Sequence, residues 1–214
     1  ALSVQGPPSF TVLTQLGLDG LETAKPFDIR HFPYRGDTLM VSRTGFTGDL
    51  GYELWIKPEL ALSLWDDLYA AGENYGIQPY GEVATNMARL EAGFIMPAMD
   101  FNEALKTVHF EHDQSPFELN LGWLVDFEKP HFSGRRALLQ EQRRGPRYTL
   151  TRLDIEGNKP ADGAIIYRDQ QLRTEIGYVT SAMWSPAVKA NIALAMIRSE
   201  YLDGPIWAEI WYQK

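Results

Sequence analysis

The chain has 214 residues, of which 44% are hydrophobic and 22% are charged, the ordinary balance of a globular protein. Its net charge of −8 argues against binding to nucleic acid or to an anionic membrane, because both require a positively charged surface. The lack of cysteine excludes disulfides, thiolate nucleophiles and cysteine-ligated zinc or iron–sulfur sites. No apolar run approaches the ~20 residues of a membrane span and no signal peptide is visible, so we expect a cytoplasmic protein.

Residues 1–92 are expected to mix helices with strands. A helix is predicted over 9–16, after a Gly-Pro-Pro turn. Alternating residues predict strands at 38–43 and 52–57. Between these strands lies a glycine-rich turn, 44–51, so the two strands form a hairpin whose long tip is large enough to meet a ligand.

Two helices are predicted next, from apolar residues at helical spacing. The first begins at Pro58. Its buried stripe consists of Leu60, Leu64, Leu68 and Ala71. The second covers residues 81–92 and ends at Gly93. Its inward residues are expected to be Val83, Met87 and Leu90.

After residue 93 the sequence pattern changes twice. Residues 97–131 lack periodicity and predict a long connection, and long connections without regular structure are usually functional. Ser133 is a plausible N-cap for a helix through Gln142, and the Arg-Arg-Gly-Pro-Arg run at 143–147 marks a boundary. Short alternating strands then follow one another at 148–155, 164–168, 175–180, 192–197 and 206–212. Their regular spacing predicts a small antiparallel barrel or sandwich.

Several stretches, in order, resemble the glycine-cleavage T-protein (aminomethyltransferase) family. They are ALSVQGP at 1–7, SRTGFTGDLGYEL at 42–54, RLEAG at 89–93 with Asp100 after it, PFELNLGWLVDFEKPHFSGRRAL at 116–138, and GYVTSAMWSPAVKANIALA at 177–195. Each match alone is weak, but their ordered conjunction covers nearly the whole chain.

The resemblance implies an α+β fold. It comprises the C-terminal part of the T-protein folate-binding domain (residues 1–104), a connector with an insertion and a short helix (105–146), and a small antiparallel C-terminal β-barrel (147–214). Roughly the first third of a family polypeptide precedes the position of Ala1 and contains the catalytic aspartate. No catalytic residue can therefore be assigned here, and this fragment alone is expected to be inactive.

The function implied by the resemblance is transfer of a one-carbon unit, aminomethyl or methyl, to N5 of tetrahydrofolate. In the glycine-cleavage version the donor is an aminomethyl group on the lipoyl arm of a carrier protein. Two alternatives remain open. One is a folate-dependent demethylase acting on a small-molecule donor, such as a methoxy-aromatic, methylamine or sulfonium compound. The other is a non-catalytic folate-binding module of a larger enzyme.

Glu53 and Phe46 are the first folate-binding residues that the resemblance implies. A carboxylate accepts two neighbouring N–H bonds from the pterin edge, and this fork-to-fork pairing fixes the orientation of the ring. The alternative for Glu53 is an exposed strand residue. Phe46 replaces the family's tyrosine, so stacking on the pterin is kept while a hydroxyl contact is lost. The glycines at 45, 48 and 51 allow a close approach of the backbone.

Thr85 is the main departure from the family pattern, which usually has Arg-Asp where this chain has Thr85-Asn86. The family arginine helps to hold folate, and threonine supplies no bidentate cation. Arg89, four residues later on the same helix face, is a candidate substitute, although a salt bridge to a nearby acid is an alternative role. Thr85 is therefore assigned to substrate specificity.

Trp123 matches a family tryptophan near the folate pocket, with a place in the core as the alternative. Trp184 is expected to pack in the core of the second domain, with a cap over the folate pocket as the alternative. The stretch 104–113 resembles an insertion, and its His109 and His112 are assigned to substrate specificity. Their spacing is not the His-Glu-x-x-His pattern of a helical zinc site, so no metal is expected.

Overall fold

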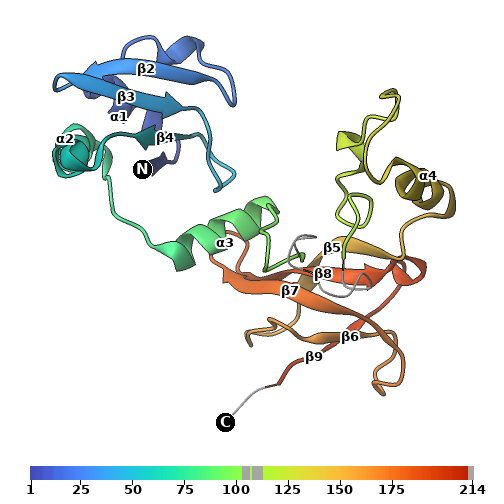
Figure 1. Cartoon of the computed structure of the whole chain (residues 1–214). Coiled ribbons are helices and arrows are strands. Elements are labelled where there is room, and N and C mark those ends of the chain that lie inside the picture. The colour runs from blue at the N-terminus through green and yellow to red at the C-terminus, as the bar shows by residue number, and fades with distance from the viewer. Residues whose placement is uncertain (103–106, 108–112, 212–214) are drawn as a thin grey trace. The chain divides into compact units, whose positions relative to one another are not determined.

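The computed structural model describes residues 1–102, 107 and 113–211. The chain divides into two compact units, Ala1–Ala92 and Gly93–Lys214, and Figure 1 shows the elements of both. The domain boundaries that the sequence predicts, at 104 and 146, stay predictions. Among the described residues, none of the helices has both the length and the apolar character needed to cross a bilayer.

The first unit is built on a four-stranded antiparallel sheet in the order β1-β4-β3-β2. Its strands are β1 (Leu2–Gln5), β2 (Ile29–Tyr34), β3 (Asp37–Ser42) and β4 (Gly51–Trp55). Its helices are α1 (Ser9–Gln15), α2 (Ala61–Gly72) and α3 (Glu82–Ala92). Short 3₁₀ turns lie at Leu21–Thr23, Pro58–Leu60 and Glu73–Tyr75. The predicted helices and the predicted hairpin are confirmed.

One face of this sheet packs against helices to form the core of the unit. Strand alternation turns Leu39, Val41, Tyr52 and Leu54 to this face, where all four are buried. Leu64 and Leu68 of α2 are buried in the same cluster, and Leu60 and Ala71 pack partly buried against it. The stripe predicted from helical spacing is therefore confirmed.

Two details of this unit differ from the prediction. Val83 was expected to point inward but is 72% exposed, whereas Leu90 of the same helix is buried. The strand β2 was not predicted at all. Most of its residues are exposed, and it is an outer strand of the sheet. An outer strand with little burial lacks the alternation of apolar and polar residues that reveals a strand in a sequence.

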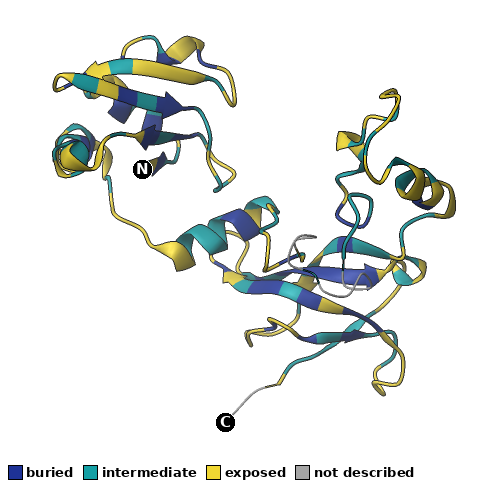
Figure 2. Ribbon diagram, viewed as in Figure 1, coloured by how far each residue is buried: buried dark blue, intermediate teal, exposed yellow. Residues whose placement is uncertain are grey.

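The second unit contains a five-stranded antiparallel sheet in the order β5-β8-β7-β6-β9. The strands are β5 (Tyr148–Ile155), β6 (Ile165–Tyr167), β7 (Glu175–Ser185), β8 (Ala190–Arg198) and β9 (Trp207–Glu209). All five predicted strands are confirmed, and Figure 2 shows the buried residues of β7 and β8. A ladder between β5 and β9, which would close the sheet into a barrel, is not recorded within the described ranges.

The remaining elements of this unit are α4 (Arg135–Arg144) and two 3₁₀ turns, Gly122–Leu124 and Ser199–Tyr201. The prediction that Ser133 caps α4 is wrong. Gly134 occupies the N-cap position with a left-handed φ of 84°, and no side chain caps the helix. Glycine tolerates that conformation, so the entry into α4 depends on backbone freedom rather than on a serine hydroxyl.

Candidate functional site

Glu53 lies in the middle of β4, between Ser3 of β1 and Ser42 of β3 in register. Its neighbours Tyr52 and Leu54 point to the core, so Glu53 points to the opposite face of the sheet. There it is half-buried. A carboxylate in this position is an acceptor-only group on a rigid strand, which suits recognition of a pair of adjacent N–H donors.

The turn after β3 begins beside this carboxylate. The hydroxyls of Ser42 and Thr44 are hydrogen-bonded at 3.0 Å. The side chain of Arg43 donates to the carbonyl of Ala24 at 2.6 Å, which anchors the base of the turn to the preceding loop. Phe46 follows, half-buried on the turn. The sheet thus presents a carboxylate and an aromatic ring from neighbouring segments of one unit.

The three glycines of the turn approach this chain's own residues. A Cβ atom at Gly48, whose φ is 79°, would lie 2.5 Å from the Cβ of Ala92 at the end of α3. A Cβ atom at Gly45 or Gly51 would instead overlap the side chain of Gln5. The space beside these glycines is therefore occupied by Gln5 and Ala92, and the predicted close approach of the backbone to a ligand stays a prediction.

Thr85 and Arg89 both lie on α3. The hydroxyl of Thr85 donates to the carbonyl of Gly81 at 3.1 Å, within the first turn of the helix. Thr85 also lines a groove of about 470 Å³ in the first unit. The aromatic residues lining this groove are Trp65, Tyr69, Tyr75 and Tyr80. Thr85 therefore adds no charge to an aromatic surface.

Arg89 is completely buried, and its Nε donates to Oδ1 of Asn86 at 2.6 Å. Asn86 stands where the family pattern has aspartate, so this acceptor is a neutral amide. The folate role of Arg89 and the specificity role of Thr85 stay predictions.

Trp123 lies in the second unit, in the 3₁₀ turn Gly122–Leu124, and is 78% exposed. The alternative of a core tryptophan is therefore wrong, and its predicted folate contact stays a prediction. Trp184, expected in the core, is 48% exposed. His109 and His112 lie outside the described residues. Within the described ranges, the side chains of His, Asp and Glu form no group that would hold a metal ion.

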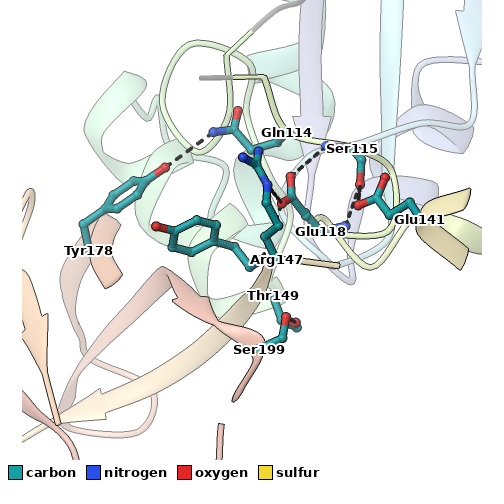
Figure 3. A network of polar contacts seen from close by, with 9 residues as sticks. Gln114, Ser115, Glu118, Glu141, Arg147, Thr149, Tyr178 and Ser199 are labelled. Carbon is teal, nitrogen blue, oxygen red and sulfur yellow. Dashed lines mark hydrogen bonds and ion pairs between the residues drawn. The ribbon is translucent and has the colours of Figure 1, made fainter. Parts of the chain in front are cut away.

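The segment that leads to Trp123 is fixed by a buried polar network, shown in Figure 3. Ser115 and Glu118 form a reciprocal pair. The backbone N–H of Glu118 donates to Ser115 Oγ at 3.1 Å, and the N–H of Ser115 donates to Glu118 Oε2 at 3.0 Å. The reciprocal bonds have the geometry of a capping box, here on a turn, and the Ser-x-x-Glu spacing is its sequence signal. Ser115 also donates to Glu141 of α4 at 2.7 Å.

The same network joins this segment to the start of β5. Glu118 Oε1 accepts from the backbone N–H of Tyr148 at 3.4 Å and lies 3.5 Å from Nε of Arg147. The backbone N–H of Leu150 donates to the carbonyl of Glu118 at 2.7 Å. Glu118 is only 2% exposed, so one buried carboxylate ties the Trp123 segment to the sheet.

Gln114 extends the network to β7. Its amide nitrogen lies 3.4 Å from the hydroxyl of Tyr178. Burial raises the pKa of the Tyr178 phenol above its ordinary value. This tyrosine therefore stays neutral at physiological pH.

Asp100 forms a second buried junction in this unit. Its carboxylate accepts from Thr180 Oγ1 at 2.7 Å, from Ser181 Oγ at 2.6 Å and from the N–H of Met96 at 2.8 Å. Thr180 is the extra residue of a bulge in β7. Consecutive strand residues normally point to opposite faces, and the bulge allows Thr180 and Ser181 to reach the same oxygen. Two of the sequence motifs thus meet at Asp100.

Comparison with known proteins identifies the family. The model described as the GCVT N-terminal domain matches residues 1–129. The chain belongs to the glycine cleavage T-protein family. The model of the glycine cleavage T-protein C-terminal barrel domain matches residues 149–210. The T-protein resemblance found in the sequence is confirmed, together with the fold class.

Individual T-protein relatives agree with this assignment. An aminomethyltransferase of Caldanaerobacter subterraneus is 35% identical, over 94% of this chain and 51% of its own length. One of Leptospira interrogans is 31% identical, over 98% and 54%. The crystal structure of aminomethyltransferase T from Bartonella henselae superposes with a TM-score of 0.80 at 25% identity, over 97% and 54%. The chain therefore spans about half the length of the relatives it matches.

Proposed function

We propose that this chain is part of an aminomethyltransferase that transfers a one-carbon unit to tetrahydrofolate. Membership of the T-protein family and relatives named aminomethyltransferase support the reaction class. The observation that carries the folate proposal is the position of Glu53. It is a half-buried carboxylate on the outer face of the sheet, between two serines and beside the turn that bears Phe46.

The residues of this face fit the pterin end of folate. The acceptor-only carboxylate of Glu53 would bind the neighbouring N–H groups of the ring and set its orientation. Phe46 would cover the ring by stacking and exclude water from one side. Tetrahydrofolate, when bound, supplies the nitrogen that accepts the one-carbon unit. The contribution of this chain is placement, which converts an encounter between two molecules into a reaction within one complex.

The donor proposed is the aminomethyl group of a lipoyl carrier protein, because the relatives that match this chain are named aminomethyltransferases. Thr85 and the insertion at 104–113 remain the positions at which donor specificity is predicted to differ. The cytoplasmic location also stays a prediction.

Calorimetric titration of tetrahydrofolate into the full-length protein tests the folate site. Wild type should bind saturably, and Glu53→Gln should weaken binding at least tenfold, about 1.4 kcal/mol, because the amide replaces one acceptor by a donor. Glu59→Gln, an exposed glutamate of the same unit, is the matched control and should bind as wild type. Equal affinity of wild type and Glu53→Gln would exclude Glu53 as the pterin contact. No binding by wild type would reject folate dependence itself.

A further inference from the structure

Gln5 lies at the edge of the proposed folate site. It is the last residue of β1 and lies opposite Gly51 of β4. Strand alternation places its side chain on the outer face with Ser3, whereas Val4 points to the core. Gln5 therefore shares a face with Glu53, two register positions away.

The amide of Gln5 is hydrogen-bonded at both ends. Its Nε2 donates to Ser3 Oγ at 2.9 Å and lies within 3.4 Å and 3.5 Å of the carbonyls of Thr44 and Tyr52. Its Oε1 accepts from Thr47 Oγ1 at 3.1 Å. Glutamine has both donors and an acceptor, so one side chain joins β1, β4 and two points of the turn.

The end of the Gln5 side chain fills the space that a side chain at position 45 or 51 would need, so a larger residue there must displace the Gln5 amide from its hydrogen bonds. The atom nearest to a Cβ built at either glycine is Oε1 of Gln5, at a distance that no non-bonded pair tolerates. Neither glycine has a positive φ, in contrast to Gly48. The preference for glycine at 45 and 51 therefore comes from the position of the Gln5 amide, and the conformational freedom of glycine is not what decides it.

We propose that Gln5 is a positioning residue of the folate site. Its amide contacts Thr44 and Thr47, which precede and follow Phe46 in the turn, and its strand pairs directly with the strand that carries Glu53. Gln5 thereby fixes the position of the Phe46 ring relative to the Glu53 carboxylate. Its effect on folate rests on the proposed function, whereas its hold on the turn stands on these contacts alone.

A double-mutant cycle on the full-length protein tests, without folate, whether Gln5 fixes the turn. Gly51→Ala should raise the unfolding equilibrium constant in urea about tenfold or more in the wild-type background. In the Gln5→Ala background, where the space is empty, the same change should cost less than about threefold. Gly81→Ala is the control, because a Cβ there meets nothing within 4 Å. An equal effect of Gly51→Ala in both backgrounds would overturn the proposal.

Gln5→Met separates filling of the space from hydrogen bonding. Methionine has a similar length but cannot bond the turn, so the variant should unfold near the wild-type midpoint. Amide hydrogen exchange at residues 44–50 should nevertheless speed up at least about fivefold, and the dissociation constant for tetrahydrofolate should rise by a similar factor. Gln15→Met, at an exposed glutamine of α1, should change neither quantity.

The outcomes separate this proposal from the proposed function. If wild type binds folate and Gln5→Met binds equally well, the positioning role is wrong even when the cycle shows coupling. If wild type does not bind folate, the folate part fails together with the proposed function, and the cycle and the exchange rates alone decide the hold on the turn. Unchanged exchange at residues 44–50 in Gln5→Met would overturn that hold.

Discussion

The two units hold their candidate ligand-facing segments by different chemistry. In the first unit the turn at 44–50 is tied to β1 by neutral groups, the amide of Gln5 and the hydroxyl of Thr47. In the second unit the segment that carries Trp123 is tied by two buried carboxylates, Glu118 and Glu141. Both arrangements satisfy their polar groups, but the consequences of breaking them differ.

A neutral hydrogen bond contributes a net ~1 kcal/mol to stability, whereas an ion-paired carboxylate that is buried leaves costly partners behind when it is removed. The turn of the first unit should therefore change its order with only a modest loss of stability. The segment of the second unit should behave as a fixed anchor. The comparison leads to three predictions, beginning with the largest effect.

Glu118→Ala should destabilise the second unit by about 3 kcal/mol. It leaves the backbone N–H groups of Ser115 and Tyr148 without their acceptor, and each buried unsatisfied donor costs roughly 1–3 kcal/mol. Urea unfolding of the full-length protein measures the loss. Glu128→Ala, an exposed glutamate of the same connector, should stay within about 0.5 kcal/mol of wild type. A loss from Glu118→Ala as small as that control would show that the carboxylate is no anchor.

The fold was largely predictable because the apolar residues of most helices and strands recur at the spacing typical of that element. The stripe of α2 and the five strands of the second unit follow from apolar spacing. The strand β2 gave no such signal, since it is exposed along most of its length. Val83 was misplaced because an apolar residue near the start of a helix is not obliged to be buried.

The candidate site was less predictable than the fold. Glu53 and Phe46 were found through a family motif, but the role of Gln5 depends on a pairing between β1 and β4 that is distant in sequence. The capping box of Ser115 and Glu118 had a readable spacing that sequence reasoning passed over. The exposure of Trp123 could not be predicted from the sequence, because tryptophan is as compatible with a core position as with a surface position.

Lowering the pH should destabilise the first unit through a charged cluster that is separate from the neutral turn. The hydrogen bond from Tyr34 lowers the pKa of Asp67 below its ordinary value of 3.8, and Arg35 lowers it further. A lowered folded-state pKa stabilises the fold above pH 3.8, and that contribution is lost as the pH falls through the folded pKa.

Thermal unfolding of wild type and Asp67→Asn from neutral to acid pH measures this modest contribution. The difference between the two proteins should shrink as the pH falls below 3.8. Tyr34→Phe removes the largest cause of the shift and should move the acid loss of stability to higher pH. A constant difference across the whole range would show that Asp67 does not titrate with folding. The neutral cluster around Gln5 should add no pH dependence of its own.

Trp123→Ala should have the smallest effect on stability. With 78% of its surface exposed, its removal should change the free energy of unfolding by less than about 0.5 kcal/mol. If Trp123 contacts folate, the same variant should still weaken tetrahydrofolate binding in calorimetry. A large loss of stability would contradict its exposure, and unchanged affinity would remove it from the folate site.

The overlap between Gln5 and the two glycines also constrains how this sequence can change over time. A larger residue at 51 displaces the Gln5 amide while glutamine remains at position 5, and it meets no such neighbour after position 5 has become small. The order of substitutions therefore matters, because one order passes through an intermediate with a displaced glutamine and the other does not. Lineages that lose the glutamine first would be free to diversify the turn, whereas those that keep it lose the position of its amide when either glycine is replaced.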